Sequence, residues 1–241
     1  MSVRVGLLEC DHVDDRFRPI AGDYNDMFAS LFARAGVDLD FVRYNVRGGE
    51  LPATVTECDG YLCTGSRHSV YDDADWIKQA ARLVRSLHDT GRPLIGVCFG
   101  HQLIAEALGG TVEPAATGWG VGVHGIEIAQ HEQWMTPRSL RCRLQFMHQD
   151  QVSRLPAEAV LLGRTDHCPI AMFRVGTTTL GIQAHPEFTV AYAEALLDAR
   201  VALIGADRID EARQSIEPTT DERAVARWLA LFIEGRAEIA S

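Results

Sequence analysis

The chain lacks long apolar runs, an excess of positive charge and paired-cysteine motifs. No apolar stretch in its 241 residues approaches the roughly 18 that a membrane-spanning helix needs, so we expect no membrane partner. The net charge of −10 would repel phosphate backbones, so we expect no nucleic-acid partner. The apolar stretch at residues 5–8 is too short for the core of a signal peptide. Together these absences predict a cytoplasmic protein.

The cysteines also exclude several kinds of site. None of them forms a Cys-x-x-Cys pair, and no Cys/His cluster has the short paired spacing of a structural zinc site. Without an oxidising compartment we expect free, mostly buried thiols, no metal and no cofactor. Cys10 and His12, two residues apart, are the one alternative for a metal. The six cysteines are Cys10, Cys58, Cys63, Cys98, Cys142 and Cys168.

Strand-like and helical segments alternate through the first half, a pattern typical of an α/β fold with a mostly parallel central sheet flanked by helices. The expected strands there are residues 3–8, 39–44, 59–63 and 93–97, and the expected helices are 24–35, one ending near 88, and 101–108. The second half adds shorter strands, at least partly antiparallel, at 121–128, 144–147, 160–163, 170–175 and 178–183. Helices at 189–204 and 221–234 follow. Without a repeat or a linker, residues 1–241 are expected to form one domain.

One segment combines an apolar strand, a tight turn and a helix start. Gly96 and Gly100 flank Cys98, and small residues at these flanks suit a sharp strand-to-helix turn. Such a turn lifts the central side chain out of the sheet and puts a helix N-terminus behind it, which favours a thiolate. The backbone N–H of Phe99 would then face a developing oxyanion. Cys98 is the candidate nucleophile, with a packed core cysteine as the alternative.

A nucleophilic cysteine needs a base, and His185 is the candidate by context. It follows the expected strand at 178–183, at the sheet edge where sites assemble in open α/β folds. Glu187, two residues later, can hydrogen-bond the imidazole and fix its tautomer. The alternative is a surface-loop histidine with an incidental glutamate.

Further polar and aromatic residues lie outside these motifs. Glu9, Asp11 and His12 follow the first expected strand and could line a pocket at the same edge. Trp119 and Trp134 are expected to cover buried residues or to form an interface, and not to take part in the function.

Four segments resemble motifs of the class I, triad-type glutamine amidotransferases. Residues 93–105 resemble the nucleophile motif, and residues 183–188 resemble the His-x-Glu motif. Residues 64–72 look like the oxyanion loop of the branch similar to the glutaminase part of GMP synthetase, and residues 147–152 also look like that branch. The segments occur in the family's order and cover nearly the whole chain. The resemblance implies the flavodoxin-like fold of this family.

The resemblance also implies a role for each matching residue. Cys98 would attack a glutamine side-chain amide, His185 would move the proton and Glu187 would orient His185. The amides of Gly65 and Phe99 would stabilise the oxyanion. The implied substrate-binding or pocket-shaping residues are Gln102, Ser66, His148, Gln149 and Asp150. The oxyanion loop departs from the family by reading Gly-Ser where many relatives have Gly-Gly, which preserves a backbone donor.

Three functions remain open at this point. The first is a glutaminase that supplies ammonia, alone or to an unfused synthetase partner, since family members normally feed a synthetase and none is fused here. The second is a hydrolase of other γ-glutamyl amides or peptides with a larger leaving amine. The third is a silent regulatory or binding subunit, which the intact cysteine, histidine and glutamate disfavour. A protein of the DJ-1 type would lack the downstream His-x-Glu pair. The substrate is in each enzymatic case a small molecule, and a homo-oligomer remains open.

Overall fold

The computed structural model describes residues 2–216 and 219–236. Within this part of the chain, a large mixed sheet has the strand order β2-β1-β3-β4-β11-β10-β9-β6-β7. Its parallel half consists of β2 (Leu39–Tyr44), β1 (Val3–Leu8), β3 (Gly60–Cys63), β4 (Leu94–Val97) and β11 (Thr179–Ile182). Its antiparallel half consists of β10 (Met172–Val175), β9 (Ala159–Arg164), β6 (Gly120–Ile128) and β7 (Arg141–His148). The predicted α/β fold with an antiparallel addition in the C-terminal half is confirmed.

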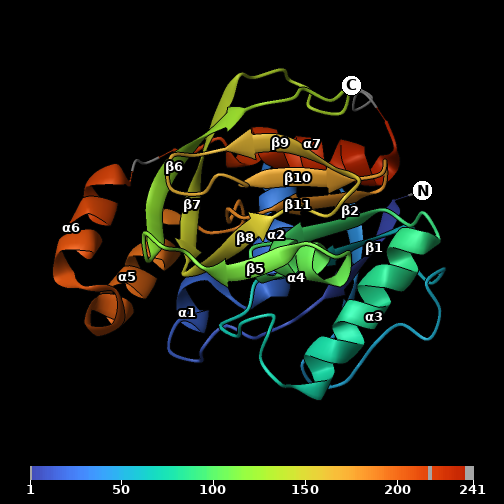
Figure 1. Ribbon diagram of the computed structural model, residues 1–241, viewed down its shortest axis with the longest axis horizontal. Helices are drawn as coiled ribbons and strands as arrows, with labels where there is room; N and C mark the ends of the chain where they lie inside the picture. Colours follow the sequence, from blue (N-terminus) through green and yellow to red (C-terminus); the bar gives the residue numbers. More distant parts are fainter. Residues whose placement is uncertain (1, 217–218, 237–241) are drawn as a thin grey trace.

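Helices cover both faces of the sheet (Figure 1). On one face pack α2 (Tyr24–Arg34), α5 (Val190–Ile204), α6 (Ala206–Ser215) and α7 (Glu222–Glu234). On the other pack α3 (Asp75–Asp89) and α4 (Phe99–Ala107). Successive side chains of β4 point to opposite faces of the sheet, so Leu94 belongs to one core and Ile95 to the other. A short helix, α1 (Arg18–Ala21), follows the loop after β1.

The structure contains elements that the sequence did not predict. A two-stranded sheet joins β5 (Thr111–Pro114) to β8 (Asp150–Arg154), and α1 and α6 were also missed. Val152 is the buried residue of β8, so that strand shows no apolar alternation to detect. Helix α4 begins at Phe99 rather than at residue 101, since the helix starts directly at the turn after β4.

The fold brings four loops to one edge of the sheet. Because β1, β3, β4 and β11 are mutually parallel, their carboxyl ends lie together, and the candidate residues follow them. Figure 1 shows α5 and α6 at the β6–β7 side of the molecule and α3 at the opposite side. No helix of the described residues is both long and apolar enough to cross a bilayer.

Candidate active site

Cys98 occupies a strained position between β4 and α4. Its φ of +52° is the one positive value found for a non-glycine residue in the described chain. The backbone N–H of Cys98 donates to the carbonyl of Ile182 (2.9 Å), and its carbonyl accepts from the N–H of Gln102 (3.1 Å). These contacts hold a conformation that costs about 1–3 kcal/mol when unsupported. The side chain is 6% exposed and lines the main cavity.

The turn requires glycine on both sides of Cys98. A Cβ added to Gly96 would lie 2.3 Å from the carbonyl carbon and oxygen of Gly100 and 2.7 Å from the backbone nitrogen of His101. A Cβ added to Gly100 would lie 2.5 Å from the carbonyl oxygen of Cys63. All of these neighbours are backbone atoms, so no side-chain rotation relieves the overlap.

We expect Gly96→Ala to lower the free energy of unfolding by about 3 kcal/mol or more, measured by urea denaturation. The matched comparison is Gly91→Ala, where the added Cβ meets no atom within 4 Å and φ is +67°. That variant is expected to lose about 1–2 kcal/mol, the cost of left-handed backbone alone. Equal losses in the two variants would contradict the steric interpretation.

His185 and Glu187 meet Cys98 at this turn. The Nδ1 atom of His185 lies 2.7 Å from Oε1 of Glu187, and the side chains of His185 and Cys98 line the same cavity. Both residues are buried. The backbone N–H of His185 donates to the carbonyl of Gln145 on β7 (2.8 Å), and the ring stacks on Phe188 with centroids 3.9 Å apart. The three residues expected to act together therefore lie in one row.

The electrostatics of this row favour a charged imidazole. Burial on its own lowers the pKa of His185, but the negative charges of Cys98 and Glu187 and the hydrogen bonds to both raise it well above the ordinary 6.5. The arrangement therefore stabilises an imidazolium at His185, beside the candidate nucleophile.

The two expected oxyanion donors lie beside the nucleophile. A Cβ on Gly65 would lie 3.0 Å from Cε1 of His185 and 3.8 Å from Cβ of Cys98, so the Gly65 backbone closely approaches both. Phe99 is the first residue of α4, and N–H groups in the first turn of a helix have no intrahelical acceptor. Ser66 also lines the cavity, and its hydroxyl accepts from the N–H of His68 (3.2 Å).

The other expected pocket residues join β8 to α4 and to the oxyanion loop. The side-chain nitrogen of Gln102 donates to the carbonyl of Asp150 (2.7 Å) and to Oε1 of Gln183 (3.1 Å). The Asp150 carboxylate accepts from the hydroxyls of Ser69 and Tyr71. These contacts use polar groups of Gln102 and Asp150 to position the cavity wall.

His148 and Gln149 complete that wall. Nδ1 of His148 lies 3.0 Å from the carbonyl of Asp150, and burial lowers the pKa of His148 to about 3, so the ring is neutral at neutral pH. The carbonyl of Gln149 accepts from the N–H of Ala115 (2.8 Å). Both residues, with Gln102 and Asp150, line the main cavity.

Residues after β1 support the oxyanion loop. The Asp11 carboxylate accepts from the backbone N–H of Arg67 (3.0 Å) and from its Nε (2.7 Å). Asp11 and His12 line the cavity, as the sequence suggested, whereas Glu9 pairs with Arg43 at 3.2 Å.

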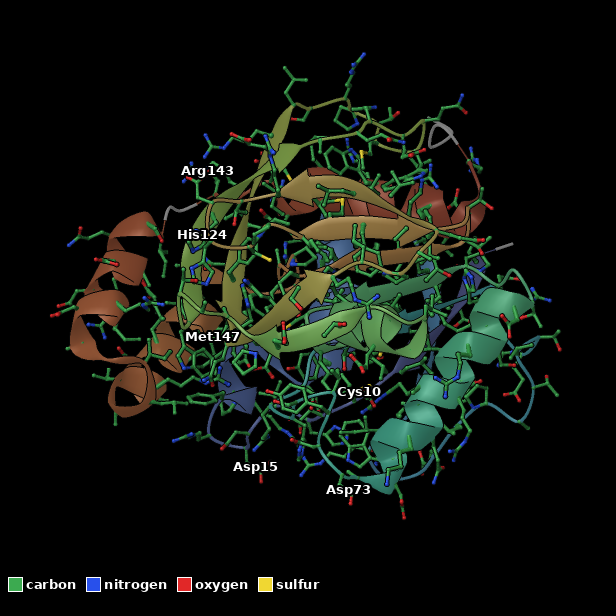
Figure 2. The ribbon with its side chains drawn as sticks, viewed as in Figure 1. Cys10, Asp15, Asp73, His124, Arg143 and Met147 are labelled. Carbon is green, nitrogen blue, oxygen red and sulfur yellow. The ribbon has the colours of Figure 1, made fainter. Side chains whose placement is uncertain are left out.

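Cys10 and His12 do not form a shared metal site. The Sγ atom of Cys10, a residue labelled in Figure 2, lies 3.3 Å from that of Cys63. The ring of His12 hydrogen-bonds the side chains of Asp23 and Asn45. Within residues 2–216 and 219–236, no three His, Cys, Asp or Glu side chains are grouped to bind a metal.

The cavity of about 330 Å³ extends well beyond the triad. Its inner end holds Cys98 and His185, and its outer part is lined by residues that lie outside the sequence motifs. Met147 of β7, labelled in Figure 2, lines the cavity together with residues of α5. The outer lining includes Arg16, Phe17, Trp119, Tyr192, Arg200 and Leu203. No local motif marks these residues, because they meet only when α5 packs beside β7. Trp119, which was expected to cover buried residues or form an interface, is one of the residues that line the cavity.

Comparisons with known proteins identify the family of this chain. The family model "Glutamine amidotransferase class-I" matches residues 21–199. Gamma-glutamyl peptidase 5 of Arabidopsis thaliana is 31% identical over 90% of each chain, and gamma-glutamyl peptidase 3 of the same plant is 30% identical over 95% of each. Glutamine-hydrolyzing GMP synthase of Aeropyrum pernix is 30% identical over 77% of this chain and 36% of its own length.

A solved structure shows the same fold. A glutamine amidotransferase from Thermotoga maritima superposes with a TM-score of 0.76 over 98% of each chain, at 21% identity. The family model spans most of the chain, and the relatives reach 30% identity over nearly its full length. This chain therefore belongs to the class I glutamine amidotransferase family.

Proposed function

We propose that this enzyme, an amide hydrolase of its family, cleaves γ-glutamyl amides whose leaving amine is larger than ammonia. The observation that carries the proposal is the cavity, which continues past His185 to Arg200 and Leu203 on α5. A glutamine side chain, which releases only ammonia, needs no such space beyond the reacting carbonyl. The gamma-glutamyl peptidases of Arabidopsis thaliana, similar over 90% or more of both chains, support the same proposal.

The geometry suits a two-step reaction through a thioester. The Cys98 thiolate attacks the γ-carbonyl carbon, and the N–H groups of Gly65 and Phe99 donate to the oxyanion. The His185 imidazolium gives its proton to the amine nitrogen as the C–N bond breaks. Water then attacks the thioester, His185 takes a proton from it, and glutamate and the Cys98 thiolate are released. Glu187 holds the imidazole in the required tautomer throughout.

Glutamine hydrolysis is the second candidate. The inner end of the cavity would bind the same γ-glutamyl group, and the similarity to GMP synthases favours this alternative. In that case ammonia would serve an unfused synthetase partner. The two candidates share Cys98, His185 and Glu187 and differ in what occupies the outer cavity.

A substrate panel distinguishes them. Purified protein is offered glutamine, γ-glutamyl-alanine, γ-glutamyl-phenylalanine and the α-linked dipeptide Glu-Phe, and glutamate release is measured. We expect kcat/KM for γ-glutamyl-phenylalanine to exceed that for glutamine by about tenfold or more, because buried apolar area in the outer cavity adds binding energy. The α-linked dipeptide should not be cleaved, since its scissile carbonyl is not that of the side chain. Efficient turnover of glutamine alone would replace the proposal with the second candidate.

A further inference from the structure

A row of aromatic rings leads away from the triad histidine. The His185 ring stacks on Phe188, with an interplanar angle of 11°. Phe188 meets Tyr192 edge-on at 4.8 Å, and Tyr192 meets Phe17 edge-on at 6.2 Å. All four side chains line the cavity. The row forms a continuous, mainly apolar wall between the reacting atoms and the outer cavity.

The chemistry of the reaction places the leaving group on this wall. His185 must reach the amine nitrogen to protonate it, so the amine's substituent begins where the aromatic row begins. An aromatic surface favours an apolar substituent, because each packed ring removes apolar area from water.

Two arginines that line the cavity lie over aromatic rings. The guanidinium of Arg16 lies 4.6 Å from the ring centroid of Phe17, and that of Arg200 lies 5.8 Å from the ring centroid of Trp119. Arg16 is 63% exposed and pairs with Asp14 at 3.4 Å. Arg200 is half-buried, and throughout the described chain no carboxylate is paired with it.

The charge of Arg200 reaches into the wall. Burial raises the pKa of Tyr192, and the positive charge of Arg200 acts in the opposite direction. Leu203, three residues later on α5, also lines the cavity and is 63% exposed. The outer cavity thus presents a cation next to apolar side chains.

We propose that Arg200 binds the free carboxylate of the leaving amino acid, whose apolar side chain packs on Trp119 and Leu203. A planar guanidinium held on an aromatic ring suits two-point binding of a carboxylate. The substrates are then γ-glutamyl peptides that end in an apolar amino acid, rather than γ-glutamyl amines. This inference rests on the proposed function.

The test compares two substrates that differ only in the carboxylate. They are γ-glutamyl-phenylalanine and γ-glutamyl-phenethylamide, whose leaving amines share the aromatic side chain. We expect Arg200→Gln to lower kcat/KM for the first by about 10- to 100-fold, the loss typical of a charge-assisted hydrogen bond. The loss for the second should be below about threefold, since it has no carboxylate to bind. Arg200→Lys keeps the charge and should recover part of the discrimination.

Two further arginine variants complete the design. Arg82→Gln on α3 lies outside the cavity and should leave both kcat/KM values unchanged, which controls for loss of a surface charge. Arg16→Gln tests the other cation at the cavity mouth. If the carboxylate-specific loss appears in Arg16→Gln instead of Arg200→Gln, the assignment to Arg200 is overturned.

The remaining outcomes separate this inference from the function on which it rests. If the wild type cleaves both compounds but Arg200→Gln affects them equally or not at all, carboxylate binding by Arg200 is wrong and γ-glutamyl hydrolysis stands. If the wild type cleaves glutamine but neither compound, both proposals are overturned.

Discussion

Replacing Cys98 with alanine is expected to lower kcat/KM for γ-glutamyl hydrolysis by at least about 10⁴-fold, because no thioester can form. The backbone N–H groups of Gly65 and Phe99, proposed as oxyanion donors, remain in place in this variant, so a residual rate would report on them and on substrate binding. Glutamate release from γ-glutamyl-phenylalanine, measured under saturating and subsaturating conditions, gives kcat and KM separately.

The fold must survive for this result to be informative. We expect the circular dichroism spectrum of Cys98→Ala to match the wild type, because the backbone hydrogen bonds to Ile182 and Gln102 do not involve the thiol. Cys142→Ala is the matched control, since Cys142 is also buried but does not line the cavity. A glutamine-analogue diazo ketone should label Cys98, and mass spectrometry that finds the label elsewhere would contradict the assignment. Activity of Cys98→Ala near the wild-type level would do the same.

Glu187→Gln is expected to lower kcat by about 10²- to 10⁴-fold, because an amide neither fixes the His185 tautomer in the same way nor stabilises the imidazolium. Glu187 is fully buried, so water cannot replace the lost charge. Glu106→Gln, an exposed change on the same helix as the nucleophile turn, is the matched control and should be neutral.

The same variant should change the pH dependence. In the wild type, Cys98 and Glu187 raise the pKa of His185 above 6.5, so the imidazolium persists and the alkaline limb of kcat/KM lies above that pH. Removing the charge of Glu187 removes one of these causes, and the alkaline limb should move down toward neutral pH. An unchanged alkaline limb would show that Glu187 does not act on His185 electrostatically.

The stability of the protein should follow the same titration. A histidine whose folded pKa is raised stabilises the folded state fully below its unfolded pKa of about 6.5, and this contribution is lost as pH rises through the folded value. The free energy of unfolding, measured by urea denaturation, should therefore fall in the wild type as pH rises above 6.5. The fall should be smaller in Glu187→Gln.

Local patterns in the chain were sufficient to predict the core strands of the sheet and the three candidates for the triad. The apolar run at β4, the glycines at positions 96 and 100, and the His-Pro-Glu segment each lie within a few residues. Such signals survive in a sequence because strand burial and a tight turn act on neighbouring residues. The structure places His185 in a hydrogen bond with Glu187 and on the same cavity as Cys98.

Other features escaped because their signals are not local. The β5–β8 pair has no apolar alternation that would mark its strands. Its two segments lie about 40 residues apart in the chain, so their pairing leaves no local pattern. Gln102 and Asp150 were expected to serve the substrate pocket, and the structure shows in addition that Gln102 donates to the carbonyl of Asp150 and to the side chain of Gln183, directly after β11.

By itself the sequence determined the class of fold, the family motifs and the candidates for a nucleophile and its base, because each depends on residues close along the chain. The tertiary structure decided the length and character of the cavity. Phe17 follows β1, Trp119 precedes β6 and Arg200 lies on α5, and only the tertiary structure brings these separate segments to one cavity. The sequence therefore sufficed to predict cleavage of a γ-glutamyl amide, whereas the proposal for the leaving amine depends on a surface assembled from distant segments.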